Sequence, residues 1–288
     1  MKTLTLRTSV GHLAANLYMP RTETMEKPPL VIVTGAWTTV KEQMPAVYAE
    51  AIVKLGYAAL TFDFRGWGES TGWIKYLEDP ARKTDDIRAV IDAASQLEQI
   101  DSNRIFGLGI CASTGYMLDA ASGNSKITAV AAVAPWMHNR EIANAVYGGE
   151  AAVDNLIELG QEAASTGAVF IEAASNENDS SLMYQAPYYT EPHRGKIPEY
   201  DNLFNVASWK PWLTYDALSG ARTQDKPVLL IASEAMALPT GTHQYLEQSG
   251  DNVSAIWLDG VTQFDFYDVP EHVQTASAAA IEHFAQAC

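Results

Sequence analysis

Cys111 lies in a sequence context that could make its thiol a nucleophile. The segment Gly107–Ser113 reads GLGICAS and lies between an apolar run and a stretch of small residues typical of a helix. In a nucleophile elbow, small residues two before and two after the nucleophile let the chain turn sharply from strand to helix. Gly109 and Ser113 hold these positions. A helix N-terminus there would favour the thiolate and offer N–H groups to an oxyanion. The alternative is a buried structural cysteine at a tight turn.

A second run, Asp63–Ser70 (DFRGWGES), follows another apolar segment and precedes the elbow by one strand–helix unit. Together the two motifs resemble the α/β-hydrolase superfamily, and the cysteine makes the chain most similar to its dienelactone-hydrolase-like branch. The order of elements is similar along nearly the whole chain. The resemblance implies an enzyme with an α/β-hydrolase fold that cleaves a carboxylic ester or related acyl bond. It implies no cofactor and no metal, and a structural role for the Arg65-Gly66 loop.

The superfamily's oxyanion hole pairs the N–H after the nucleophile with one from the loop after the third strand. Carried over by position, these donors are the amides of Ala112 and of Ala36 or Trp37, at the end of the sequence VTGAW. Backbone donors require no particular side chain. Trp37 could equally be a packing residue.

The superfamily's acid and histidine positions are filled by other residues in this chain. Met236 occupies the usual acid position, and the nearest carboxylate, Glu234, is either an orienting group or a solvated loop residue. Gln263, in the sequence DGVTQFDF, occupies the histidine position. A carboxamide donates and accepts hydrogen bonds but cannot take a proton near neutral pH. The chain therefore lacks the usual general base.

Trp136 and His138 directly follow an expected strand, at the carboxyl edge where ligands bind in open α/β sheets. Both are candidate substrate-binding residues. His138 is also the first candidate for a replacement base, with a structural or solvated histidine as the alternative. The other histidines belong to the expected hairpin, insertion or outer helices: His12, His193, His243, His272 and His283.

The elements that must position these residues alternate as in a parallel sheet with helices on both faces. Continuous apolar runs predict buried strands, and amphipathic or small-residue segments predict the helices between them. Residues 3–20 alternate in period two about Gly11 and predict a β-hairpin. The expected strands are 28–36, 57–64, 104–111, 127–134, 228–233 and 253–258, and the expected helices 42–55, 85–97, 112–121, 243–248 and 271–287.

Residues 136–226 break this alternation and are richer in polar and aromatic residues. The stretch is too long for an ordinary loop, so we predict a helical cap insertion over the mouth of the sheet. The α/β-hydrolase core would then comprise residues 1–135 and 227–288.

Composition argues against several kinds of partner. The chain has 19 basic and 35 acidic residues, and its formal net charge of −16 disfavours nucleic acid and anionic membranes. It lacks an apolar signal segment and any run of about 18 apolar residues. Two cysteines form neither a disulfide framework nor a zinc site. We therefore expect a cytoplasmic protein with a small-molecule substrate. An exposed apolar face of the cap would support a homodimer.

Three functions fit these residues. The first is hydrolysis of a small ester, lactone or thioester by Cys111, in an atypical triad with Glu234 and Gln263. The second is a lyase, cyclase or isomerase whose oxyanion hole stabilises an enolate-like species. The third is non-catalytic ligand binding. Hydrolysis is favoured, with slow turnover, because loss of a triad member commonly costs on the order of 10³–10⁶ in rate.

Overall fold

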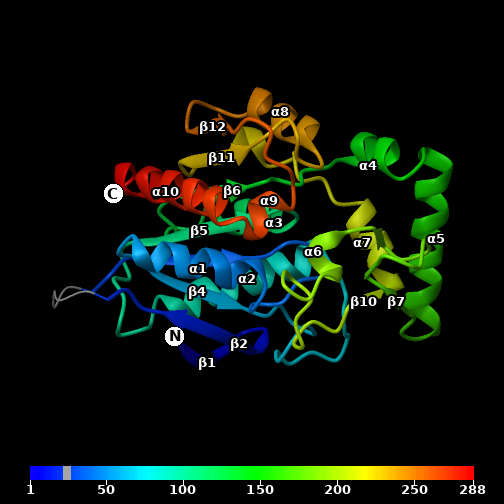
Figure 1. Cartoon of the computed structure of the whole chain (residues 1–288), viewed down its shortest axis with the longest axis horizontal. Helices are drawn as coiled ribbons and strands as arrows, with labels where there is room; N and C mark the ends of the chain where they lie inside the picture. Colours follow the sequence, from blue (N-terminus) through cyan, green and yellow to red (C-terminus); the bar gives the residue numbers. More distant parts are fainter. Residues whose placement is uncertain (22–26) are drawn as a thin grey trace.

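A twisted, mostly parallel sheet forms the centre of the molecule in the computed structural model, which describes residues 1–21 and 27–288 (Figure 1). The described residues contribute eight strands to it: β1 (Lys2–Thr8), β2 (Gly11–Tyr18), β3 (Leu30–Thr34), β4 (Ala58–Phe62), β5 (Ile105–Ile110), β6 (Val130–Val133), β11 (Val228–Ala232) and β12 (Val253–Trp257). Their order is β1-β2-β4-β3-β5-β6-β11-β12. The β1–β2 and β2–β4 pairs are antiparallel, and the other pairs are parallel.

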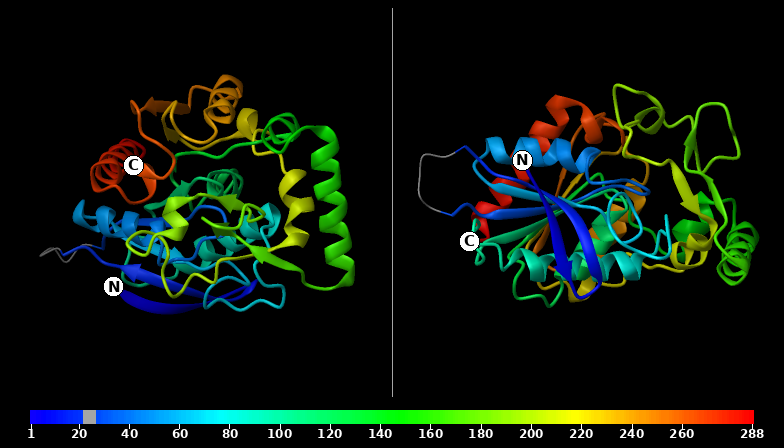
Figure 2. Two further views of the ribbon diagram at one scale, coloured as in Figure 1. Left: turned by 45° about the vertical axis from the view of Figure 1, so that its right-hand side comes forward. Right: turned by 90° about the horizontal axis from the view of Figure 1, so that it is seen from below.

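Helices cover both faces of this sheet, which explains why its central strands are apolar throughout. One face is covered by α1 (Met44–Lys54) and α10 (Pro270–Gln286), the other by α2 (Pro80–Ala94) and α3 (Ser113–Ala121) (Figure 2). Two further helices belong to the core, α8 (Pro239–Gln248) and the short α9 (Asp265–Asp268). Every residue of β3, β4, β5, β6 and β11 is buried. The predicted α/β-hydrolase fold is confirmed.

Helix α2 begins earlier than the sequence pattern indicated. The apolar face predicted a helix from residue 85, but the structure starts it at Pro80. Asp79 is the N-cap, and its side chain accepts the N–H of Arg82 at 3.2 Å. Proline at the first helical position and aspartate at the N-cap are favourable at helix starts, and neither contributes to apolar periodicity.

The alternation of strands and helices is interrupted between β6 and β11, where the insertion was expected. The interrupting segment is not purely helical, because short strands accompany its helices. Its elements are α4 (Arg140–Val146), α5 (Glu150–Thr166), β7 (Phe170–Glu172), β8 (Ala174–Ser175), β9 (Met183–Tyr184), α6 (Pro187–Thr190), β10 (Leu203–Asn205), the 3₁₀ turn η1 (Val206–Ser208), α7 (Trp209–Leu213) and the 3₁₀ turn η2 (Ala221–Thr223). Helix α5 forms its outer edge, away from the sheet (Figure 1).

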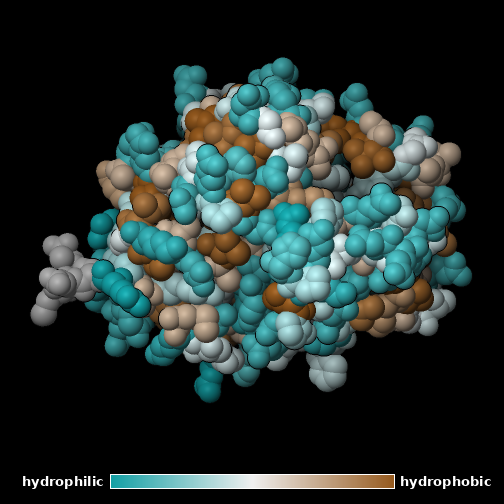
Figure 3. Space-filling view, viewed as in Figure 1, coloured by the Kyte–Doolittle hydropathy of each residue, from teal (hydrophilic) through white to brown (hydrophobic). Residues whose placement is uncertain are grey.

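The surface carries mostly hydrophilic residues on the face shown in Figure 3, with hydrophobic residues in separate patches. Among the residues that the structure describes, no helix has the length and apolar character needed to cross a membrane.

Candidate active site

Cys111 lies at the sharp turn between β5 and α3. Its φ of +58° is in the left-handed region, which non-glycine residues rarely adopt. The turn is held by hydrogen bonds from the Cys111 N–H to the Val133 carbonyl at 3.0 Å and from the Thr114 N–H to the Cys111 carbonyl at 3.1 Å. A Cβ added to Gly109 would lie 2.9 Å from the Ser113 carbonyl oxygen, so this position requires glycine. The local geometry is that of a nucleophile elbow.

The thiol is buried but not sealed inside the sheet. Cys111 is 6% exposed and lines a cavity of about 440 Å³. Core and insertion both contribute to the walls, which are rich in aromatic rings. Within the described chain, no Asp, Glu, His, Lys or Arg side chain lines this cavity. Its lining residues are Trp37, Cys111, Ala112, Trp136, Val146, Tyr147, Leu182, Met183, Tyr189, Trp212, Ala237, Gln263, Phe264 and Tyr267.

Two backbone N–H groups face the sulfur of Cys111, and they belong to Ala112 and Trp37. The Ala36 amide donates instead to the Met44 sulfur at 3.5 Å. Of the two loop donors considered from the sequence, the structure therefore favours Trp37. The Trp37 indole also packs, because it stacks on Trp212 with ring centroids 4.8 Å apart.

Burial controls the protonation of this thiol. It raises the pKa of Cys111, and hydrogen bonds from Tyr267, Ala112 and Trp37 lower the pKa by less. Because a charged thiolate is poorly solvated in an apolar cavity, the neutral thiol is the resting form. The expectation that the helix N-terminus favours the thiolate is overridden by desolvation.

Gln263 is close to Cys111 but is linked to it through a tyrosine. Its Oε1 accepts the Ala237 N–H at 3.0 Å, and its Nε2 donates to the Ala134 carbonyl at 3.0 Å and to Tyr267 Oη at 3.1 Å. Tyr267 lines the same cavity as Cys111, and its hydroxyl acts on the sulfur so as to lower the pKa of the thiol. Tyr267 was not among the residues predicted from the sequence. Its spacing of four residues from Gln263, which places two side chains on one side of a helical turn, was the available signal.

Glu234 lies outside the candidate site. Its side chain is 69% exposed, and its Oε1 is 2.8 Å from Nε2 of His243. The His243 ring stacks on Trp257. The Gln263 carboxamide is oriented by the backbone of Ala237 and Ala134, so Glu234 has no orienting contact with it. The structure corresponds to the alternative reading of Glu234 as a solvated loop residue, and Met236 leaves the acid position without a carboxylate.

His138 packs behind the cavity wall, whereas Trp136 lines the cavity. The His138 side chain is buried, its Nε2 is 2.8 Å from the Trp212 carbonyl, and its ring lies 4.5 Å from the Trp212 ring. Burial lowers the pKa of His138 and so favours the neutral ring. The structure therefore gives His138 the structural role that was its alternative, and not that of a base beside Cys111.

A buried carboxylate that the sequence analysis did not single out supports the oxyanion loop. Glu78 Oε2 accepts the Thr38 N–H at 3.2 Å and the Lys83 ammonium at 2.8 Å, and Oε1 accepts the Tyr116 hydroxyl at 3.0 Å. Thr38 follows Trp37 directly and has a φ of +63°. Glu78 thus ties the loop carrying the Trp37 amide to both α2 and α3.

The Asp63–Ser70 loop holds the β3–α1 loop at a second point, because Asp63 binds Lys41, three residues after Thr38. Asp63 Oδ1 accepts the Lys41 N–H at 2.8 Å, and Oδ2 accepts the Lys41 ammonium at 2.8 Å and the Glu69 N–H at 3.0 Å. Arg65 forms an ion pair with Asp86. The loop has the structural role expected from the resemblance.

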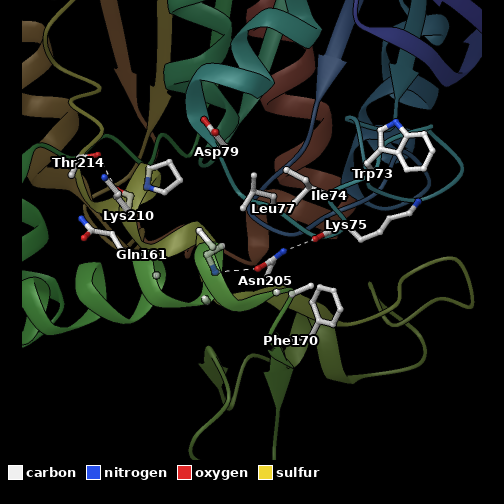
Figure 4. A pocket seen from close by; sticks show the side chains of 17 residues that line it. Trp73, Ile74, Lys75, Leu77, Asp79, Gln161, Phe170, Asn205, Lys210 and Thr214 are labelled. Atoms are coloured by element: carbon white, nitrogen blue, oxygen red, sulfur yellow. Dashed lines mark hydrogen bonds between the residues drawn. The ribbon is translucent and has the colours of Figure 1, made fainter.

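A larger groove of about 970 Å³ lies between the loop that precedes α2 and the elements α5, β7 and α7 (Figure 4). The side-chain amide of Asn205, which lines this groove, already has hydrogen-bond partners. It donates to the Lys75 carbonyl and accepts the Ala207 N–H, both at 3.0 Å. The groove has no cysteine or histidine among its lining residues. Across the described residues, no group of three or more His, Cys, Asp or Glu side chains has the arrangement of a metal site.

The sheet order, the elbow and the paired N–H groups define an α/β-hydrolase-fold protein. A model of the X-Pro dipeptidyl-peptidase (S15) family matches residues 11–240. The chain therefore belongs to this family. The superfamily expected from the sequence is confirmed, while the dienelactone-hydrolase-like branch stays a prediction.

A similar protein and two similar structures were also found, and the structures agree with the fold. The chain is 27% identical over 286 residues to the uncharacterized protein YcjY of Escherichia coli K12, covering 94% of this chain and 93% of YcjY. The crystal structure of the hypothetical protein PA2218 of Pseudomonas aeruginosa superposes with a TM-score of 0.86 and 22% identity, covering 98% and 93% of the two chains. The α/β hydrolase GrgF from Penicillium sp. sh18 gives a TM-score of 0.82 at 16% identity, covering 99% and 98%.

We expect that Gln263→His alone will not create a general base. The Ala237 N–H requires a lone pair where the carboxamide oxygen now lies, so the imidazole nitrogen there would be unprotonated. The other nitrogen would carry the proton and face Tyr267, and it could not accept the thiol proton. Steady-state hydrolysis of a nitrophenyl ester should change by no more than about threefold. A rise of about tenfold or more would contradict this tautomer argument.

Proposed function

We propose that this protein is a hydrolase in which Cys111 attacks a small ester, lactone or thioester and forms a covalent thioester. The proposal rests above all on one observation, namely a sulfur that lies at the elbow, faces the amides of Ala112 and Trp37, and opens onto a cavity. In using a cysteine at this position, the proposed enzyme resembles the dienelactone-hydrolase-like branch.

The chemistry follows from the groups around the Cys111 sulfur, namely the N–H groups of Ala112 and Trp37 and the hydroxyl of Tyr267. Sulfur forms a bond to the carbonyl carbon, and the carbonyl oxygen gains charge between the N–H groups of Ala112 and Trp37. The bond to the leaving group then breaks, and the leaving oxygen or sulfur takes the proton that the Cys111 thiol has lost. Water completes the cycle by displacing Cys111. Because a thiol is intrinsically more nucleophilic than a hydroxyl, acylation requires less help from a base than it would with serine.

The cavity favours an uncharged acyl group with aromatic or other unsaturated character. Its lining contains no charged side chain, so a buried ion would lack a partner. The indole N–H groups of Trp37 and Trp136 are buried and have no acceptor among the described residues. A dipeptide such as the family name describes carries an ammonium group, for which this lining provides no carboxylate.

The test is pre-steady-state hydrolysis of activated aryl esters. We expect a burst of one equivalent of phenol per chain, followed by a slow phase, because the cavity holds no imidazole or carboxylate to activate water. Intact-mass analysis during the slow phase should show the acyl group on the peptide that contains Cys111. Acylation of Cys288 alone, or no burst with any aryl ester, would contradict the proposal.

A second candidate is a lyase, cyclase or isomerase acting in the same cavity. One observation favours it, namely that no histidine, carboxylate or amine lines the cavity to activate water, while N–H donors for an enolate-like oxygen are in place. It predicts conversion of an unsaturated ketone or lactone with no covalent acyl adduct at any time.

A further inference from the structure

We propose that Tyr267 is a catalytic residue that carries the proton between Cys111 and the leaving group, in the place of the missing histidine. This inference rests on the proposed function, since it concerns how the acyl group reaches the sulfur.

The hydrogen bonds of Gln263 determine how it contacts the Tyr267 hydroxyl. Gln263 must present Oε1 to the Ala237 N–H and Nε2 to the Ala134 carbonyl, so its carboxamide cannot be reversed. The remaining Nε2 proton is directed to Tyr267 Oη at 3.1 Å. The phenol oxygen is therefore an acceptor from Gln263 and keeps a second lone pair that can accept the Cys111 thiol proton, while its own proton can be donated to the sulfur or to a bound leaving oxygen.

Packing and a neighbouring hydrogen bond hold Tyr267 in one position. The residue is 2% exposed and belongs to α9, whose Phe266 carbonyl accepts the Tyr48 hydroxyl at 2.7 Å. The Tyr188 ring packs edge-on against the Tyr267 ring with centroids 5.1 Å apart. A reacting group held in this way loses little freedom when the substrate binds.

The proposed step is a concerted relay that conserves charge. As the sulfur bonds to the carbonyl carbon, the thiol proton passes to Tyr267 Oη, and the phenol proton passes to the departing oxygen. The carbon–oxygen bond breaks, and a neutral alcohol leaves with Tyr267 again neutral. In deacylation, water attacks the thioester carbon, gives its proton to Tyr267, and the phenol proton returns to the sulfur.

Electrostatics in the cavity favour such a relay over separate ions. Burial raises the pKa of Tyr267 well above its usual value, and burial also raises the pKa of Cys111. Neither a phenolate nor a thiolate is stable in this apolar site, and the relay forms neither as a separate species.

The experiment compares two esters of one aromatic acid, a nitrophenyl ester and an ethyl ester, with wild type and Tyr267→Phe. Both reactions release the thiol proton, but nitrophenolate can leave as an anion while that proton passes to water, whereas ethoxide must take a proton as it leaves. Tyr267→Phe should slow acylation by the ethyl ester on the order of 10²-fold and acylation by the nitrophenyl ester by about threefold or less. Acylation is measured by intact mass in single-turnover reactions. Tyr245→Phe is the matched control, because Tyr245 is a buried tyrosine outside the cavity.

The outcomes separate the relay from the proposed function. An equal loss for both esters would overturn the relay and leave Tyr267 a packing residue. No loss for either ester, with wild type still forming the thioester, would also overturn the relay while the nucleophile stands. Absence of any thioester in wild type would instead refute the proposed function. If thermal melting shows Tyr267→Phe to be unfolded, Gln263→Met supplies the same comparison, because it removes the bond that orients the phenol. It should slow the ethyl ester more than the nitrophenyl ester, and an equal loss would overturn the relay.

Discussion

Cys111→Ala should abolish both the burst and the covalent adduct with every ester that wild type accepts. The methyl group cannot form an acyl bond, and the cavity offers no other nucleophile that burial leaves reactive. We expect steady-state hydrolysis to fall on the order of 10³-fold or more, measured as phenol release corrected for the uncatalysed rate. Steady turnover that survives this substitution would exclude Cys111 as the nucleophile.

Cys111→Ser is the informative companion variant. Serine is efficient in this fold when a histidine removes its proton. Here Tyr267 can relay a proton but is a far weaker base than imidazole, so the serine hydroxyl, a poorer nucleophile than the thiol, should give turnover well below that of wild type. A Cys111→Ser enzyme with near wild-type turnover would reveal a base that the described cavity does not contain.

Glu78→Ala should be the most destabilising single substitution near the site. Glu78 and Lys83 form a buried ion pair with side chains 0% and 3% exposed. Removing one partner of such a pair costs about 3–5 kcal/mol, because the remaining charge is left buried and unpaired. Urea denaturation measures this loss, and Glu98→Ala, at an exposed position of the chain, should change stability by less than about 0.5 kcal/mol.

The same substitution should also slow acylation, because Thr38 loses the acceptor that holds its φ of +63° beside the Trp37 amide. The double variant Glu78→Ala/Lys83→Met separates the two effects. It removes the unpaired charge and should recover part of the stability, while acylation by the nitrophenyl ester stays slow. Recovery of acylation together with stability would show that the Thr38 hydrogen bond does not position the oxyanion loop.

Local patterns in the chain predicted much of this architecture. The apolar runs of β3, β4, β5, β6 and β11 are continuous because both faces of each strand are covered, and the turn at Cys111 requires the small residues that identified it. Backbone donors were also accessible to prediction, since the place of Trp37 depends on element order and not on its side chain.

The residues that were missed depend on contacts between distant parts of the chain. Glu78 acquires its place through Thr38, Lys83 and Tyr116, which lie in the β3–α1 loop, α2 and α3. Glu234 follows the expected strand, but the pairing with His243 holds it at the surface. For Cys111, the helix N-terminus and burial act on the thiol in opposite senses, and only the packed structure shows that burial dominates.

The ion pair between Arg194 and Asp268 joins the insertion to the segment that carries Tyr267. The guanidinium of Arg194 donates to both Asp268 carboxylate oxygens, at 2.7 and 2.6 Å, and to the Phe264 carbonyl at 3.0 Å. Lifting this part of the insertion away from the core would therefore break bonds on either side of the phenol. The position of the phenol is therefore tied to this part of the insertion as well as to the core.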